Sequence, residues 1–273
     1  MFTKFGIPVR SKVLGLYSGT FVEDLAPLAP ARLVPIVRTP EGTVIGESLA
    51  IAETLAERHP DCGLWPEDRA ARAHARWLVA EMHAGFSALR SECPMQLLGQ
   101  YQGFAVSDAV RKDLARLEEL FAFTAPYRQE GSPWLFGPYS LADVFYAPVA
   151  ARIAGYGLPV GAPAADYVAA HLKDGAFRQW RAMGMTVSYD PVPYAMPLEQ
   201  SEWPGPKLRV AKTVANGPSL NDRCPYSGDP VTDYLEMDGH VFGFCNPFCR
   251  DKTVADPAAW PAFVEMADRL TRN

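Results

Sequence analysis

The chain has 273 residues, 48% of them hydrophobic, which is enough for two or three domains with buried cores. Its net charge of −5 comes without any basic block, which argues against nucleic acid and against an anionic membrane surface as partners. No apolar run approaches the ~20 residues that span a bilayer, and the N-terminus lacks a signal-peptide core, so we expect a cytoplasmic protein.

Residues 1–62 are predicted to form a short α/β unit. Its first signals are a helix end at 2–8 and strands at 13–17, 33–37 and 43–45. A turn at Pro40-Glu41-Gly42 separates the last two strands. A helix is then predicted to begin at Glu47-Ser48 and to stop at His59-Pro60.

Two residue pairs in this unit have the chemistry of a binding site. A helix N-terminus at Glu47-Ser48 offers unpaired N–H groups and a partial positive charge, so it suits a carboxylate. In Val34-Pro35, the proline donates no ladder hydrogen bond, and a cis peptide bond there would hold the backbone of Val34 toward a ligand. Taken alone, the two pairs would indicate only a strand edge and a helix cap.

Residues 63–189 are predicted to form an all-helical domain. The stretch from Arg69 to Arg90 has helical spacing of its apolar residues, which are Leu78, Met82, Phe86 and Leu89. Ser107 is expected to cap the next helix, and Ser140 with Asp143 predicts an acidic capping box.

Residues 190–220 are rich in proline and lack an apolar period, which indicates a linker. Residues 221–273 then predict a small, cysteine-containing α+β tail, closed by a helix that uses Phe263, Ala267 and Leu270.

Residues 1–188 resemble glutathione S-transferases, in a bacterial branch. The most specific segment runs from Glu47 to Met95 and contains Ala80-Glu81-Met82-His83. The resemblance implies a thioredoxin-like N-terminal domain, an all-α second domain, a homodimer, and glutathione and a small electrophile as substrates. It also implies that Val34-Pro35 binds the cysteinyl part of glutathione and that Glu47-Ser48 holds the γ-glutamyl group.

The residue that stabilises the thiolate is missing from this pattern. The family uses a Ser, Tyr or Cys in the loop after the first strand, and neither that strand nor that residue has a counterpart here. Without the internal first strand, the strand at 13–17 has no partner for its backbone N–H and C=O groups. We therefore expect either that the natural chain begins upstream of Met1 or that a truncated chain has become a non-catalytic scaffold.

No residue of the chain is assigned as catalytic. The nearest hydroxyls are Thr3, Ser11 and Tyr17, of which the first two are expected to be a solvent-facing and a turn residue. Other residues have a weak functional interpretation beside an ordinary structural one: Arg32 for the glycyl carboxylate, His83 as a base, Met82, Phe86 and Leu89 as a pocket lining, and Cys62 and Cys93 as free thiols.

Three cysteines of the tail are spaced for metal binding. Cys224, Cys245 and Cys249 are separated by twenty and then three residues, and an odd total of five cysteines argues against a disulfide framework. Three thiolates suit zinc or another thiophilic metal, with water, His240, Asp222 or Asp251 as the fourth ligand. The tail is similar to YHS/TRASH-type heavy-metal-binding modules, and the alternative is a small domain with three reduced cysteines.

Three functional hypotheses follow. The first, which we favour, is an enzyme that transfers glutathione to a small electrophile. The second is a non-catalytic glutathione- or partner-binding scaffold. The third is a metal-sensing or metal-delivery protein that uses the transferase fold to dimerise.

Overall fold

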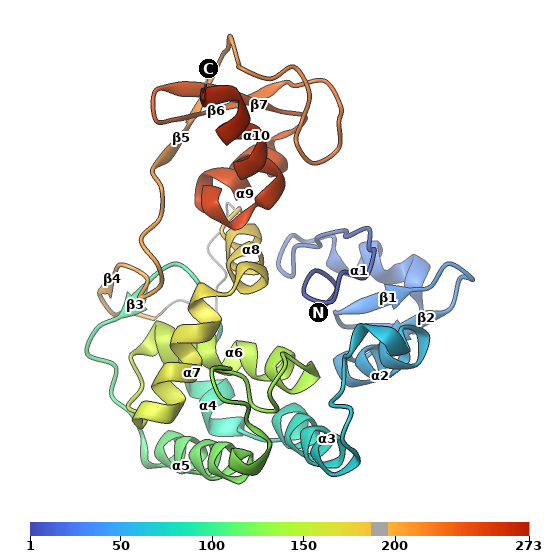
Figure 1. Ribbon diagram of the computed structural model, residues 1–273, viewed down its shortest axis with the longest axis vertical. Helices are drawn as coiled ribbons and strands as arrows, with labels where there is room; N and C mark the ends of the chain where they lie inside the picture. The colour runs from blue at the N-terminus through green and yellow to red at the C-terminus, as the bar shows by residue number, and fades with distance from the viewer. Residues whose placement is uncertain (187–195, 273) are drawn as a thin grey trace. The chain divides into compact units, whose positions relative to one another are not determined.

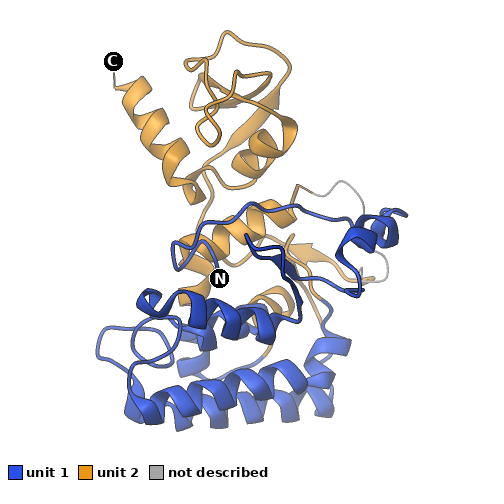
Figure 2. Cartoon of the chain, turned by 90° about the vertical axis from the view of Figure 1, so that its right-hand side faces the viewer, with its two compact units in different colours: residues 1–94, 105–149, 159–167 blue, residues 95–104, 150–158, 168–273 orange. Residues whose placement is uncertain are grey.

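The computed structural model describes residues 1–186 and 196–272. The chain divides into two compact units, which Figure 2 shows in blue and orange. Unit 1 comprises residues 1–94, 105–149 and 159–167, and unit 2 comprises residues 95–104, 150–158 and 168–273. Among the described residues, no helix has the length and apolar character needed to cross a membrane. Residues 187–195, where the predicted helical domain ends and the predicted linker begins, lie outside the described residues.

The first residues of unit 1 have the hydrogen bonds of a helix C-terminus. The N–H of Ile7 donates to the carbonyl of Phe2 (3.0 Å) and that of Gly6 to the carbonyl of Thr3 (3.4 Å), with Gly6 at φ 63°. This is the Schellman arrangement that ends many helices, so the predicted helix end at 2–8 has the expected geometry.

The strand predicted at 13–17 does not form. Residues 12–15 have no regular structure and residues 16–17 form a turn, with 62% of Val13 and 49% of Tyr17 exposed. An isolated strand cannot satisfy its backbone groups, and no neighbouring strand is placed to pair with it among the described residues. The segment continues instead into the short helix α1 (Phe21–Leu25) and a 3-10 turn at Ala26–Leu28.

A hairpin and a helix complete the N-terminal segment (Figure 1). Strand β1 (Ile36–Arg38) pairs antiparallel with β2 (Val44–Gly46), and α2 (Ser48–Arg58) follows at once. The helix ends where the sequence predicts, at His59-Pro60, and it buries Ile51, Ala52 and Leu55. A 3-10 turn at Pro60–Cys62 leads to the helical region.

The helical region contains α3 (Arg69–Ala84), α4 (Ser87–Glu92), α5 (Asp108–Phe123), α6 (Leu141–Tyr156), α7 (Ala162–Lys173) and α8 (Gly175–Gly184). The predicted helix at 69–90 is therefore two helices. Gly85 is extended and Phe86 has φ 55°, and a Cβ on Gly85 would lie 2.7 Å from the carbonyl oxygen of Glu81. The apolar residues on both sides of the break are buried nevertheless.

The predicted helix caps are present. The hydroxyl of Ser107 accepts from the N–H of Val110 (3.1 Å) at the start of α5. Before α6, the carboxylate of Asp143 accepts from the N–H of Ser140 (2.8 Å), which is the reaching-back half of a capping box.

Unit 2 has β structure in two places. In the first, β3 (Gln100–Tyr101), inside the region predicted as all-helical, pairs with β4 (Gln200–Ser201). In the second, β5 (Ala211–Val214), β6 (Asp233–Met237) and β7 (His240–Phe244) form an antiparallel sheet in that order. The sequence places β4 and β5 in the linker, where their short polar runs give no strand signal.

The C-terminal sheet is covered by helices. Helix α9 (Pro247–Ala255), a 3-10 turn at Pro257–Ala259 and α10 (Pro261–Thr271) follow β7. The core between them contains Leu235, Phe242, Phe244, Phe263 and Met266, and Ala182 of α8 belongs to the same cluster.

Candidate functional site

The hairpin brings the two sequence-predicted pairs to the same end. The antiparallel register of β1 and β2 pairs Ile36 with Gly46. The next residues outward are Pro35 on one side and Glu47 on the other, so Val34-Pro35 and Glu47-Ser48 emerge side by side. The peptide bond between Val34 and Pro35 is cis. Val34, Pro35 and Glu47 are exposed and Ser48 is half-buried.

The N-terminus of α2 is open to a ligand. Glu47 is the N-cap residue at φ 65° and ψ 123°, and its carbonyl accepts from the N–H of Ile51 (3.0 Å). Within the described part of the chain, no side chain caps this helix. The first-turn amide groups and the hydroxyl of Ser48 therefore stay available for a carboxylate.

The side chain of Glu53 fixes α2 against the helical region. Its carboxylate accepts two hydrogen bonds from the guanidinium of Arg76 on α3 (both 3.1 Å) and one from the indole N–H of Trp65 (3.2 Å). Arg76 also lies 5.4 Å from the ring centroid of Trp65. These contacts set the direction in which the N-terminus of α2 points.

Thr3 and the apolar candidates lie where their structural interpretation puts them, whereas Ser11 and Tyr17 do not lie in the predicted turn and strand. Thr3 and Ser11 are exposed, and Tyr17 lies in the irregular segment described above. Arg32 is exposed as well. Met82, Phe86 and Leu89 are at most 6% exposed and belong to the core, Cys93 is buried, and Cys62 is half-buried.

His83 is the exception, because it contacts a site residue. Its Nε2 atom lies 3.7 Å from the Oε2 atom of Glu47. The sequence offered His83 only as a base or a rim residue, and only the structure shows that the last turn of α3 approaches the start of α2.

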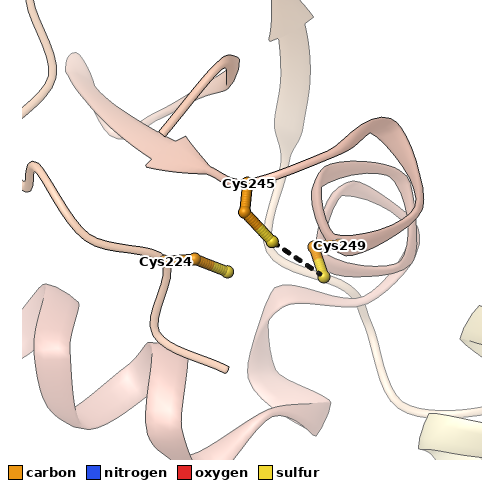
Figure 3. A group of neighbouring side chains, drawn as sticks. All are labelled: Cys224, Cys245 and Cys249. Carbon is orange, nitrogen blue, oxygen red and sulfur yellow. Dashed lines mark hydrogen bonds between the residues drawn. The ribbon is translucent and has the colours of Figure 1, made fainter. Parts of the chain in front are cut away.

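The three tail cysteines converge in unit 2 (Figure 3). Their Sγ atoms all lie within 4.8 Å of one another, and those of Cys245 and Cys249 are 3.9 Å apart. Cys224 lies in a tight loop where its N–H donates to the carbonyl of Asp229 (2.8 Å). Cys245 follows β7, and Cys249 lies in the first turn of α9.

Polar groups around the cluster hold it in place. The side chain of Asn246 caps α9 by accepting from the N–H of Cys249 (2.9 Å) and donates to the Sγ atom of Cys245 (3.2 Å). The hydroxyl of Ser227 donates to the same sulfur (3.3 Å). These residues were missed from the sequence, although Asn before Pro247 is a recognisable helix-start signal.

The thiols differ in acidity. Burial alone would raise the pKa of Cys224, but hydrogen bonds from backbone N–H groups and from Cys245 lower it below the ordinary value. Burial and the neighbouring Cys224 raise the pKa of Cys249 to about 12. The ammonium of Lys252 lies over the rings of Tyr226 (3.9 Å) and Trp260 (4.1 Å), and burial lowers its pKa against the opposing effect of the three sulfurs.

This arrangement fits a thiophilic metal. Zinc–sulfur bonds of about 2.3 Å place two sulfurs of a tetrahedral site about 3.8 Å apart, close to the spacing of Cys245 and Cys249. The proposed fourth ligands are not in the group: among the described residues, it contains the cysteines alone. His240 begins β7, and Asp251 is engaged by Arg250 (2.7 Å). Of the expected fourth ligands, His240, Asp222 and Asp251 do not join this group, and water remains the alternative.

Comparisons with known proteins cover part of the chain. Residues 3–58 match the family described as the N-terminal domain of glutathione S-transferase. A protein named "Probable maleylacetoacetate isomerase" from Caenorhabditis elegans is 39% identical over 89 residues, 33% of this chain and 41% of that protein. The maleylacetoacetate isomerase of Rattus norvegicus is 30% identical over 133 residues, 48% of this chain and 59% of that protein.

A solved structure is similar at a lower level. The crystal structure of a glutathione transferase homologue from Burkholderia GL BGR1, with bound glutathione, is 22% identical with a TM-score of 0.49, and covers 68% of this chain and 88% of that one. A likeness at this level carries no functional argument. The two curated relatives are matched over 41% and 59% of their own lengths, less than two thirds in either case. The match to a family model is confined to residues 3–58.

Proposed function

We propose that the whole chain is a glutathione S-transferase, which binds glutathione at the open end of the β1–β2 hairpin and transfers it to a small electrophile. The observation that carries this proposal is the register of β1 and β2, which places Val34-Pro35 beside Glu47-Ser48 in a segment that matches the family. The amides and hydroxyl of Ser48 at the α2 N-terminus suit the γ-glutamyl carboxylate. The carboxylate of Glu47 suits the ammonium, and the backbone of Val34 suits the cysteinyl amide.

Binding of glutathione to the full chain, measured by isothermal titration calorimetry, tests this proposal. Ser48→Ala is expected to weaken binding about tenfold, because it removes a hydrogen bond to a charged group. Ser87→Ala is the matched control, since Ser87 is the first residue of α4 as Ser48 is of α2, and it is expected to bind normally. Absence of binding by the unmodified chain would refute the proposal.

The reaction is tested separately from binding. Turnover of a reactive aryl halide, with the thiolate absorbance of bound glutathione, separates a transferase from a scaffold that only binds. The names of the curated relatives favour isomerisation as the second candidate reaction, so maleylacetoacetate is the comparison substrate. The catalytic residue stays unassigned, and a homodimer remains our expectation, to be measured by light scattering.

We further propose that Cys224, Cys245 and Cys249 hold one thiophilic metal, zinc being the first to test. The convergence of three sulfurs within 4.8 Å supports this, as does the thin core of a module of about 50 residues, which a metal would stabilise. Bound metal would supply this structural crosslink, and Lys252 would offset the negative charge of three thiolates.

Metal analysis of purified protein is expected to give about one metal per chain. Cys245→Ser should lower that content, whereas Cys62→Ser, a half-buried thiol outside the cluster, should leave it unchanged. Full occupancy in the variant with all three cluster cysteines replaced by serine would refute the site.

A further inference from the structure

We propose that His83 is a binding residue of the glutathione site and that it binds, together with Glu47, the α-amino-acid end of the γ-glutamyl group. Glu47 would take the ammonium, and His83, together with the α2 N-terminus, would take the carboxylate. The inference rests on the proposed function, and it gives the helical region a direct part in ligand binding.

The geometry places His83 next to the ligand rather than in a finished ion pair. The 3.7 Å between its Nε2 atom and the Oε2 atom of Glu47 is longer than a hydrogen bond, so both groups keep their hydrogen-bonding capacity for a third partner. The side chains are exposed to 36% and 67%, respectively, so a ligand can reach both. The carboxylate of Glu47 does not cap α2.

The position of His83 is fixed from two sides. The guanidinium of Arg90 donates to the main-chain carbonyls of His83 (3.0 Å) and Met82 (3.4 Å), which closes the last turn of α3. The contacts between Glu53 and Arg76 hold the same helix against α2. A fixed backbone at His83 lowers the conformational freedom that is lost when a ligand binds.

The charges explain why a zwitterion is the matching ligand. An α-amino acid carries an ammonium and a carboxylate on one carbon. The carboxylate of Glu47 suits the ammonium, and an N–H of the His83 imidazole would donate to the carboxylate. The first turn of α2 also favours negative charge in the ligand. A purely structural role explains less, because an exposed pair at this distance contributes little to stability.

Glutathione analogues that lack one charge each make the test. In calorimetric titrations of the full chain, His83→Ala is expected to weaken glutathione binding about three- to tenfold. His83→Ala should weaken the binding of an analogue without the α-ammonium (glutaryl-Cys-Gly) by the same factor. It should leave the binding of an analogue without the α-carboxylate (4-aminobutyryl-Cys-Gly) unchanged. His83→Gln, which keeps an N–H donor, should restore part of the affinity, and His59→Ala at the other end of α2 is the control.

The outcomes separate this inference from the proposed function. Equal weakening of all three ligands by His83→Ala would assign His83 a structural role, and unchanged binding would remove it from the site. Either result would overturn the inference and leave glutathione binding intact. Failure of the unmodified chain to bind glutathione would refute both. If His83→Ala does not fold, the same three ligands are compared with His83→Gln. The expected loss of affinity is then smaller and is confined to the two ligands that contain the carboxylate.

Discussion

Replacing Asp143 with asparagine is expected to remove a pH dependence from the free energy of unfolding. Asp143 is fully buried at the start of α6. Its carboxylate accepts from the backbone N–H of Leu135 (3.1 Å) and Ser140 (2.8 Å), and from the hydroxyls of Ser140 (3.2 Å) and Tyr167 (3.1 Å). Burial raises the pKa of Asp143 from 3.8 to about 6, and these hydrogen bonds oppose the shift only in part.

The sign and size follow from this shift. Below pH 3.8 the carboxyl holds its proton in both the folded and the unfolded state, so it adds no penalty there. Between pH 3.8 and about 6 the folded state binds more protons, so the free energy of unfolding falls as the pH rises. A shift of about two pKa units corresponds to a loss of about 3 kcal/mol, complete above about pH 7.

Urea unfolding of both proteins at a series of pH values measures this loss. Because the asparagine side chain cannot ionise, the difference in unfolding free energy between wild type and Asp143→Asn cancels every other titrating group. We expect this difference to fall by about 3 kcal/mol between about pH 4 and about pH 7. Tyr167→Phe should enlarge the loss and extend it to higher pH, because it removes a donor that lowers the pKa of Asp143. A difference that stays constant across the range would refute the reasoning.

Two other substitutions test the packing. Arg178→Ala should lower the free energy of unfolding in urea by about 3–5 kcal/mol. The substitution leaves the carboxylate of Asp256, which is 3% exposed, without its two hydrogen bonds of 2.6 and 2.8 Å to Arg178. A decrease below about 1 kcal/mol would contradict this prediction. Gly85→Ala should lower the melting temperature by an amount equivalent to about 1–3 kcal/mol, because its Cβ would lie 2.7 Å from the carbonyl oxygen of Glu81. Gly175→Ala, with no atom within 4 Å of its Cβ, is the control and should be neutral or stabilising.

Features that depend on a few neighbouring residues could be predicted from the sequence. The N-cap at Ser107 and the Asp143 contact of the capping box each follow from side chains within four positions of the backbone groups they satisfy. The start of α2 after Glu47 was predicted as well, although no side chain of the described residues caps it. The hairpin also follows from its own turn at Pro40-Glu41-Gly42. Its register then brings Val34-Pro35 and Glu47-Ser48 together without any long-range information.

Features that depend on distant partners were wrong or missing. The apolar run at 13–17 has strand propensity, but a strand needs a neighbour, and none is present for it in the part of the chain that the structure describes. The apolar spacing from Leu78 to Leu89 continues across the break at Gly85-Phe86, so periodicity alone could not reveal it. The contact of His83 with Glu47 joins two helices, and neither helix encodes it alone.

The cysteine site shows the same division. The cysteine spacing predicted that the three sulfurs converge. Cys245 and Cys249 lie at a helix start, so these two sulfurs stay close. The spacing did not exclude His240, which lies five residues before Cys245 along a strand. At ~3.3 Å per residue that is roughly 16 Å, far beyond any shared coordination sphere.

The boundary between the helical region and the tail is a matter of packing rather than of chain order. Helix α8 ends the helical region in the sequence, yet Ala182 lies in the core of the tail and Gln179 donates to the carbonyl of Ala259 (2.7 Å). Arg178 on the same helix pairs with Asp256, the residue that follows the end of α9, and α9 carries Cys249. The cysteine cluster and α8 are thus joined through one helix. Metal bound by the three sulfurs would stabilise α8 together with the sheet, so loss of metal should loosen unit 2 before it affects α2 and the proposed glutathione site.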